Sequence, residues 1–539
     1  MSRSSVPSIG AWFPGSWSPA LTPDDLHHAA AFVREPVHVV REEATGRIGV
    51  ARGGAVSMDG ASGWGWLGTL PALWPEWLGD RSFTEVHGLR FPYVAGAMAN
   101  GIHTSALTIA LAKAGMLGFF GAAGLTLERV SKGLDEIQGA LRNGETYGMN
   151  LIHAPNEPGH EMATVEMYLK RGVHRVEAAA YMGLNAMIVR YAYTGVRRGA
   201  DGRIERTNFV FAKISRPEVA RRFMSPAPAE LLDQCVSKGW LTREEAEIAR
   251  KLPVAEDISV EADSGGHTDN RPLPALFPTI LQLRDQLARE FGFDRPIRVG
   301  AGGGLGTPGA VAAAFELGAA FVLTGSVNQC SVEAGLSDDG KRMLLQADLA
   351  DVIMAPAADM FEMGVKVQVL KRGTMFGNRA LKLYDLYVAH PSWESIPAGE
   401  RARIEKELLH TSFEEVWAGT EKFFAVRGPH EVERANKDPK HKMALVFRWY
   451  LGLSSKWAIA GDPKRKLDYQ IWCGPALGSF NAWVKGSPLE PLEARTGVQI
   501  GLNLMEGAAR VTRAHQLRTF GVPVPAGAFQ FAPRIISPG

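Results

Sequence analysis

Eight short apolar runs follow one another between residues 93 and 326, and helical patterns lie between them. Each run is continuous rather than alternating and is rich in small or β-branched residues, which is typical of parallel strands buried on both faces. Strands that alternate with helices predict an α/β fold with a parallel sheet, and eight repeats predict closure into a (β/α)8 TIM barrel. The candidate strands are 93–98, 116–123, 147–152, 175–180, 209–215, 258–263, 297–302 and 321–326.

The last two candidate strands end in glycine-rich or small-residue loops. The seventh runs into GAGGGLG at 300–306, and the eighth ends at Gly325 and Ser326. Because glycine has no Cβ, backbone N–H groups can converge closely on a phosphate in such loops. A helix that begins after Thr307 and ends near Gly318 adds a helix N-terminus, which also favours an anion. A phosphate site after strands seven and eight is typical of this barrel.

The bulk composition excludes several classes of protein. Of 539 residues, 46% are hydrophobic and 22% charged, which is ordinary for a globular protein, and the net charge of +2 gives no reason to expect nucleic acid. No stretch approaches the roughly eighteen apolar residues of a membrane span, and no signal-peptide core opens the chain. The three cysteines form no CxxC pair, so we expect neither disulfides nor zinc, but a soluble cytoplasmic protein.

The apolar pattern divides the chain into three parts. Residues 1–84 are predicted to be a small irregular segment with one candidate hairpin over 37–51. Residues 85–334 hold the barrel, with a helical insertion near 216–256. Residues 335–539 are predicted to be a mostly helical cap that contributes to substrate binding. Its helical patterns lie at 348–364, 401–424, 442–452 and 479–486.

Three polar side chains are expected at the carboxyl ends of strands, where barrels of this kind place their active sites. Asn150 ends the third strand, Lys213 lies near the end of the fifth, and His267 follows the sixth. An inward ammonium group without a partner is costly, which favours a functional role for Lys213. His267 lies between glycines and the phosphate loops, and its ordinary pKa suits proton transfer near neutrality. Asn150 could equally form a turn, and His267 could bind backbone.

Other motifs are less informative. GAGGGLG looks like a dinucleotide fingerprint, but no acidic residue ends a strand at the required distance. Glu261, Asp263 and Asp269 are candidate metal ligands, yet no second cluster of histidine and carboxylate completes a site, so we predict no metal. The basic stretch over 434–442 is either a solvated face or a dock for an acidic carrier domain.

These motifs resemble the flavin-dependent enoyl reductases related to nitronate monooxygenases, and more narrowly the PfaD family. PfaD-type proteins act with polyunsaturated fatty acid synthases and as free-standing, trans-acting enoyl reductases of polyketide assembly lines. The broad resemblance rests on AGAMANGIHTSALTIALAKAGMLGFFGAAG, GMNL, EADSGGHTDNRP and GAGGGLGTP with TGSVNQ. The narrow one rests on MAPAADMFEMGVKVQVLKRGTMF, FRWYLGLSSKWA and DYQIWCGPALGSFNAWV, so it covers nearly all of the chain after residue 85.

The resemblance implies an FMN cofactor at the mouth of the barrel and NADPH as its hydride donor. It agrees with the independent argument that the glycine loops hold a phosphate. One departure is visible, because Asp263 and Ser264 precede the two glycines where carrier-protein reductases of fatty acid synthesis usually have Glu-Ala. The implied FMN-binding residues are Ala97, Met98, Ala99, Asn150, Lys213, Ser264, Gly265, Gly266, Gly302, Gly303, Gly304, Gly325 and Ser326.

The resemblance also implies the substrate, a 2-enoyl thioester held on an acyl carrier protein or carrier domain. His267 would be the catalytic residue that polarises the thioester carbonyl or supplies a proton, and Lys213 would give electrostatic support. Three rivals remain: a nitronate monooxygenase that uses oxygen, a flavin-binding synthase scaffold without turnover, and a phosphosugar-type barrel without flavin. The pathway, polyketide or polyunsaturated fatty acid, and the oligomeric state, a homodimer included, stay open.

Overall fold

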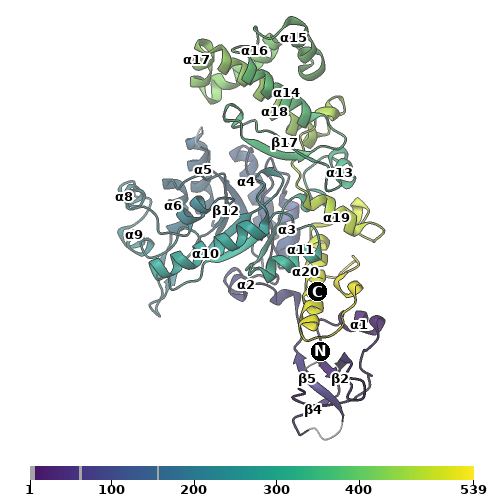
Figure 1. Cartoon of the computed structure of the whole chain (residues 1–539). Coiled ribbons are helices and arrows are strands. Elements are labelled where there is room, and N and C mark those ends of the chain that lie inside the picture. Colours follow the sequence, from purple (N-terminus) through teal and green to yellow (C-terminus); the bar gives the residue numbers. More distant parts are fainter. Residues whose placement is uncertain (1–6, 60–62, 155–156, 539) are drawn as a thin grey trace.

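The computed structural model describes residues 7–59, 63–154 and 157–538. Eight parallel strands close into a barrel in the order β12-β13-β15-β16-β6-β7-β8-β9, which confirms the predicted fold (Figure 1). Every candidate strand is present. The strands are β6 (Tyr93–Ala95), β7 (Leu117–Phe120), β8 (Gly148–Ile152), β9 (Arg175–Ala179), β12 (Phe209–Ile214), β13 (Asp257–Glu261), β15 (Arg298–Gly302) and β16 (Val322–Thr324).

Helices cover the outside of the barrel, as the sequence predicts. Thr307 caps the helix after β15, because its side chain accepts a hydrogen bond from the backbone N–H of Ala310. The insertion after β12 contains a capping box made by Thr242 and Glu245. The helices are α3 (Ser105–Lys113), α4 (Leu127–Ala140), α5 (Pro158–Lys170), α6 (Ala186–Tyr193), α7 (Pro217–Phe223), α8 (Ala229–Ser237), α9 (Arg243–Ala249), α10 (Leu273–Phe291) and α11 (Pro308–Glu316).

The eighth helix of the barrel wall comes from the far end of the chain. β16 leads only into the short helix α12 (Ser326–Gln329), whereas α20 (Gly497–Thr519) packs against α11 and α3. Two glycines of α20 allow this close approach. An added Cβ would lie 2.7 Å from the Met116 sulfur at Gly501 and 2.5 Å from the Pro308 ring at Gly507.

The N-terminal part is more regular than predicted. In place of an irregular segment it forms a five-stranded antiparallel sheet in the order β3-β2-β5-β1-β4, and the hairpin expected over 37–51 is its β2–β3 pair. The strands are short and bounded by glycine turns, which obscured their pattern in the sequence. Val37 and Val39 pack with Ala514 and Leu517 of α20. The strands are β1 (Gly10–Phe13), β2 (Val37–Arg41), β3 (Ile48–Arg52), β4 (Ala55–Ser57) and β5 (Trp64–Leu70).

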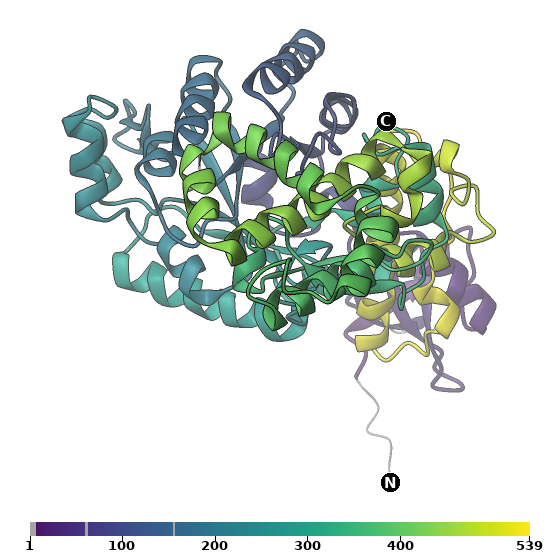
Figure 2. The same cartoon turned by 90° about the horizontal axis from the view of Figure 1, so that it is seen from above.

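Residues 352–470 form a helical lobe over the carboxyl ends of the barrel strands (Figures 1 and 2). The lobe has a hydrophobic core of its own. The helix predicted over 348–364 is wrong in part, because β17 (Val352–Pro356) lies there and pairs with β18 (Lys366–Leu370). β-branched residues favour this strand, and its final proline cannot continue a helix. The helices of the lobe are α14 (Phe376–Ala389), α15 (Ala398–Ile404), the π-helix η3 (Glu405–Leu409), α16 (Phe413–Arg427), α17 (Pro429–Lys437) and α18 (Pro439–Ala460).

The amino end of the barrel is closed by α2 (Arg81–His87) and a buried ionic cluster. Nε2 of His87 lies 3.0 Å from Oδ2 of Asp257, and Arg298 donates to both carboxylate oxygens at 2.7 and 2.8 Å. Burial alone raises the pKa of Asp257, but Arg298 and His87 outweigh it and hold that pKa well below its usual value. This end of the barrel is therefore a structural plug.

The remaining elements link these parts, and within the described ranges no helix is long and apolar enough to cross a membrane. They are α1 (Pro23–Ala29), η1 (Pro75–Trp77), the two-stranded ribbon of β10 (Arg197–Arg198) and β11 (Ile204–Glu205), β14 (Gly266–His267), α13 (Asp338–Leu345), η2 (Phe361–Met363), η4 (Pro463–Asp468), α19 (Ala476–Val484), η5 (Leu492–Ala494) and η6 (Ala526–Phe529).

Candidate active site at the mouth of the barrel

The glycine loops after β15 and β16 leave open space at the mouth of the barrel. Gly303 and Gly304 adopt the left-handed backbone conformation, with φ of +88° and +73°. An added Cβ at Gly303 would lie 2.8 Å from a backbone oxygen of the neighbouring loop, whereas at Gly304 and Gly325 it would meet nothing within 4 Å. Gly302 ends β15 and Ser326 begins α12, so both border this space. Loops of this geometry fit the phosphate end of FMN.

The loop after β6 brings Ala97, Met98 and Ala99 to the same end of the barrel. It is fixed in place, because the carbonyl of Met98 accepts a hydrogen bond from the backbone N–H of His103 at 3.2 Å. Burial lowers the pKa of His103 to about 4, so this histidine stays neutral at pH 7. The three residues that the resemblance implies as FMN-binding thus lie together at this strand end.

Asn150 is the middle residue of β8 and not, as predicted, its last residue, and it is buried. Its Oδ1 accepts a hydrogen bond from the backbone N–H of Ala123, and its Nδ2 donates to the carbonyl of Glu177, both at 3.2 Å. The amide therefore links β8 to the neighbouring strand β9 and to the loop that follows β7. Its implied role in binding FMN stays a prediction.

The helical lobe holds the loop that carries His267. Gly266 and His267 form β14, which pairs with β18 of the lobe. The side chain of Gln368, on β18, donates to the carbonyl of Ser264 at 2.7 Å. Gly265 packs so closely on the lobe's return segment that an added Cβ would lie 2.8 Å from the backbone nitrogen of Cys473. The segment 264–266, which the resemblance implies as FMN-binding, is therefore held by both the barrel and the lobe.

Asp359 of the lobe orients His267. Its Oδ1 lies 3.2 Å from Nε2 of His267, whose side chain is half exposed. Burial lowers the pKa of His267, but the hydrogen bond and charge of Asp359, with the charge of Glu261, outweigh burial and leave that pKa above its usual value. His267 therefore loses its proton at a higher pH than an ordinary histidine does. Sequence reasoning missed Asp359.

Lys213 is not an isolated buried charge. Its Nζ lies 2.9 Å from Oε1 of Glu261, which also accepts a hydrogen bond from the hydroxyl of Ser264 at 2.8 Å. Burial lowers the pKa of Lys213, but the carboxylates of Glu261 and Glu177 outweigh it and raise that pKa. The ammonium group thus remains charged beside the mouth of the barrel.

Glu177 is a second acidic residue that sequence reasoning missed. It lies in the middle of β9 and is 1% exposed. Its Oε2 accepts a hydrogen bond from the backbone N–H of Ala97 at 3.0 Å. A glutamate inside the apolar run RVEAAA was the signal that could have identified it, because acidic residues are rarely fully buried without a role.

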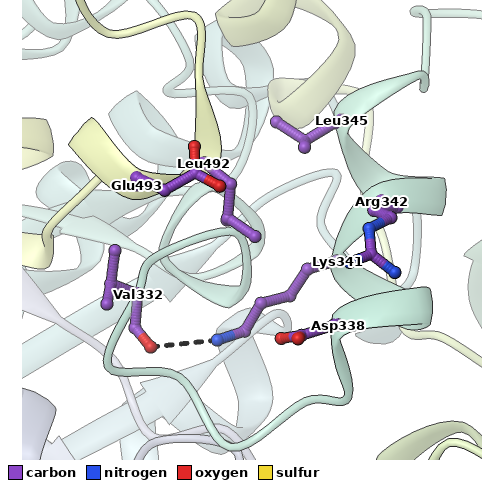
Figure 3. A pocket seen from close by; sticks show the side chains of 7 residues that line it. All are labelled: Val332, Asp338, Lys341, Arg342, Leu345, Leu492 and Glu493. Atoms are coloured by element: carbon purple, nitrogen blue, oxygen red, sulfur yellow. Dashed lines mark hydrogen bonds between the residues drawn. The ribbon is translucent and has the colours of Figure 1, made fainter.

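A cavity of about 430 Å³ lies away from these residues, between α13 and η5 (Figure 3). Lys341 points into it and donates to the carbonyl of Val332 at 3.0 Å. None of its lining residues belongs to the strand-end loops. Within the described ranges no three His, Cys, Asp or Glu side chains are grouped so that they could hold a metal ion.

Two family models match the chain. Residues 81–385 match nitronate monooxygenase. Residues 390–469, most of the helical lobe, match the inserted helical domain of acyl-carrier-protein S-malonyltransferase.

Two relatives are a polyunsaturated fatty acid synthase subunit and a polyketide biosynthesis protein. The chain is 48% identical over 448 residues to one subunit of the polyunsaturated fatty acid synthase of Thraustochytrium sp., covering 82% of this chain and 30% of that protein. It is 46% identical over 435 residues to the polyketide biosynthesis protein PksE of Bacillus subtilis, covering 80% and 56%. The chain thus spans less than two thirds of these relatives.

Among solved structures, the enoyl reductase domain of MlnA, from the macrolactin cluster of Bacillus amyloliquefaciens, superposes with a TM-score of 0.79 at 39% identity. The match covers 82% of this chain and 99% of that domain. The similarity therefore includes both the barrel and most of the segments that surround it.

Proposed function

Because the chain belongs to the nitronate monooxygenase family and matches nearly all of the MlnA enoyl reductase domain, we propose that it is an FMN-dependent enoyl reductase. It takes hydride from NADPH and reduces the α,β double bond of 2-enoyl thioesters. The observation that carries this proposal is that a glycine-lined space and His267, hydrogen-bonded to Asp359, lie at the same end of the barrel.

The residues at the mouth of the barrel have different roles in the proposed reaction. FMN, when bound, supplies the hydride that reaches the β-carbon of the substrate. The α-carbon then needs a proton, and the thioester oxygen needs stabilisation as negative charge develops. His267, whose pKa Asp359 raises, can donate a hydrogen bond to that oxygen or, when protonated, release the proton. Lys213 adds a fixed positive charge.

We also propose that an acyl carrier domain docks on the helical lobe. The lobe matches a helical domain from an enzyme that acts on acyl carrier proteins. Its helices α16 and α17 carry exposed apolar and basic side chains, and the guanidinium of Arg427 lies 5.0 Å from the ring of Phe423. Such a surface complements an acidic carrier. This carrier face consists of Phe423, Val426, Arg427, Arg434 and Lys437.

The rest of the basic stretch has a structural role. The ammonium group of Lys442 lies 4.7 Å from the ring of Trp393 and 5.0 Å from that of Trp417. Lys440 likewise lies over Tyr387. These lysines cover the aromatic core of the lobe and are left out of the carrier face.

The test is anaerobic reduction of the purified, FMN-loaded protein. We expect NADPH to bleach the flavin absorbance and a 2-enoyl thioester to restore it, with one double bond reduced per NADPH consumed. A nitronate monooxygenase would leave the flavin unreduced by NADPH and would instead oxidise nitronates. A protein that binds no FMN would overturn the proposal.

A further inference from the structure

Glu177 reaches across the inside of the barrel. β9, which carries it, pairs with β8 and β12, whereas its hydrogen-bond donor Ala97 follows β6, three strands away around the barrel. An added Cβ at Gly96 would lie 3.2 Å from Oε1 of Glu177, which confirms that the carboxyl group abuts this strand end. The carboxyl group therefore lies inside the barrel just beneath its mouth.

One oxygen of this carboxyl group has no partner. Oε1 of Glu177 is buried and makes no hydrogen bond to any residue that the structure describes. A buried, half-partnered carboxylate is costly, whereas a protonated carboxyl group removes the charge and gains an O–H donor. The geometry therefore favours the acid form.

The nearby charges favour the same form. Lys213, on β12, is already paired with Glu261, which ends β13, at 2.9 Å. One ammonium group thus faces two carboxyl groups and neutralises only one. From the loop after β6, His103 faces the same strand end, where its Nδ1 bonds the carbonyl of Gly96, and it is neutral. Burial, partly opposed by Lys213, raises the pKa of Glu177 to about 7.

We propose that Glu177 is a proton-holding positioning residue that couples the reduction potential of the bound flavin to pH. This rests on the proposed FMN site. With Glu177 protonated, Lys213 and Glu261 form a neutral pair near the mouth of the barrel. Loss of the Glu177 proton adds one negative charge there, which disfavours electron uptake and lowers the midpoint potential. The potential therefore falls more steeply with pH through neutrality than the flavin alone would require.

The experiment measures the midpoint potential of bound FMN against reference dyes from pH 5.5 to 8.5. We expect a downward break near pH 7 in the wild type. The break is absent in Glu177→Gln, which imitates the protonated form, and unchanged in the matched control Glu230→Gln, an exposed residue of α8. In Glu261→Gln, Lys213 is free to pair with Glu177, so the break moves to lower pH.

The possible results separate failure of the Glu177 inference from failure of the proposed function. A Glu177→Gln protein that binds FMN and keeps the break overturns the inference while leaving the proposed function intact, whereas a wild type that binds no FMN overturns both. Should the variant fail to fold, infrared spectra of wild-type protein labelled with ¹³C-glutamate still test it. We expect a protonated carboxyl band at pH 6 that is lost above pH 7. A spectrum without that band at pH 6 contradicts the proposal.

Discussion

Nε2 of His267 and Oδ1 of Asp359 lie 3.2 Å apart, although the two residues belong to different parts of the fold. His267 follows a barrel strand, and Asp359 lies in the connection between β17 and β18 of the helical lobe. The lobe therefore supplies the group that sets the orientation and the protonation of the histidine. A barrel without the lobe would contain His267 but would lack the carboxylate that orients it and raises its pKa.

Replacing Asp359 by Asn should shift the pH profile of enoyl reduction without loss of bound FMN. The hydrogen bond and charge that raise the pKa of His267 would be weakened, so the loss of activity with rising pH should begin at a lower pH than in the wild type. The measurement is kcat/KM from pH 6 to 9, with the flavin absorbance as a check on FMN content. Asp385→Asn, on the exposed face of α14, is the control. An unshifted profile in Asp359→Asn would remove this residue from the site.

Replacing His267 by Ala should leave a yellow protein that reduces enoyl thioesters about two to four orders of magnitude more slowly, the usual weight of one acid–base or oxyanion group. FMN should remain bound, because the backbone of β14 is still paired with β18. Stopped-flow kinetics separate the two half-reactions, and we expect reduction by NADPH to be much less affected than the enoyl step. Unchanged turnover would exclude His267 from the chemistry.

Replacing Gly325 by Ala should weaken FMN binding about tenfold or more without destabilising the protein. The added methyl group meets no protein atom within 4 Å, and φ at this position is not in the left-handed region, so the fold tolerates it. It occupies the space proposed for the phosphate. Fluorescence titration with FMN measures the effect, and Gly399→Ala, equally unobstructed but in the helical lobe, serves as control. Equal affinities in the two variants would place the phosphate elsewhere.

Replacing Asp257 by Asn should destabilise the fold by about 3–5 kcal/mol, because Arg298 would be left as a buried charge without its counter-ion. The pKa of Asp257 is lowered in the folded protein, so its contribution to stability is present above its unfolded pKa and is lost as pH falls through its folded pKa. Urea unfolding of wild type and variant at pH 7 measures the difference. The exposed Asp233→Asn should cost less than about 0.5 kcal/mol.

Reversing charge on the carrier face should affect only carrier-bound substrates. The double variant Arg434→Glu and Lys437→Glu removes two exposed positive charges from α17. We expect KM for an enoyl carrier protein to rise about tenfold, and KM for the same acyl group on a small thiol to stay unchanged. Lys251→Glu, at the end of the insertion far from the lobe, is the matched control. Parallel effects on both substrates would argue against docking at this face.

The barrel and its mouth could be predicted from the sequence because their signals are local. Each buried strand is a continuous apolar run. The glycines of 300–306 form a loop whose backbone N–H groups could approach a phosphate only because glycine has no Cβ. Asp359 could not be predicted, because it lies 92 residues from His267 and nothing in its own segment indicates the contact. The alanine-containing apolar run of β17 is compatible with both a helix and a strand, so the sequence alone favours the wrong structure. Pairing with β18 stabilises it as a strand.

The placement of α20 has a consequence for how the protein is made. Since this helix completes the barrel wall beside α3 and α11, a nascent chain has all eight strands outside the ribosome long before the wall can close. During that interval the faces of α3 and α11 that α20 later covers lack their partner, while the helical lobe, with a core of its own, can already fold. Translation speed or chaperone supply should then govern the yield of active enzyme more than the stability of the finished barrel does.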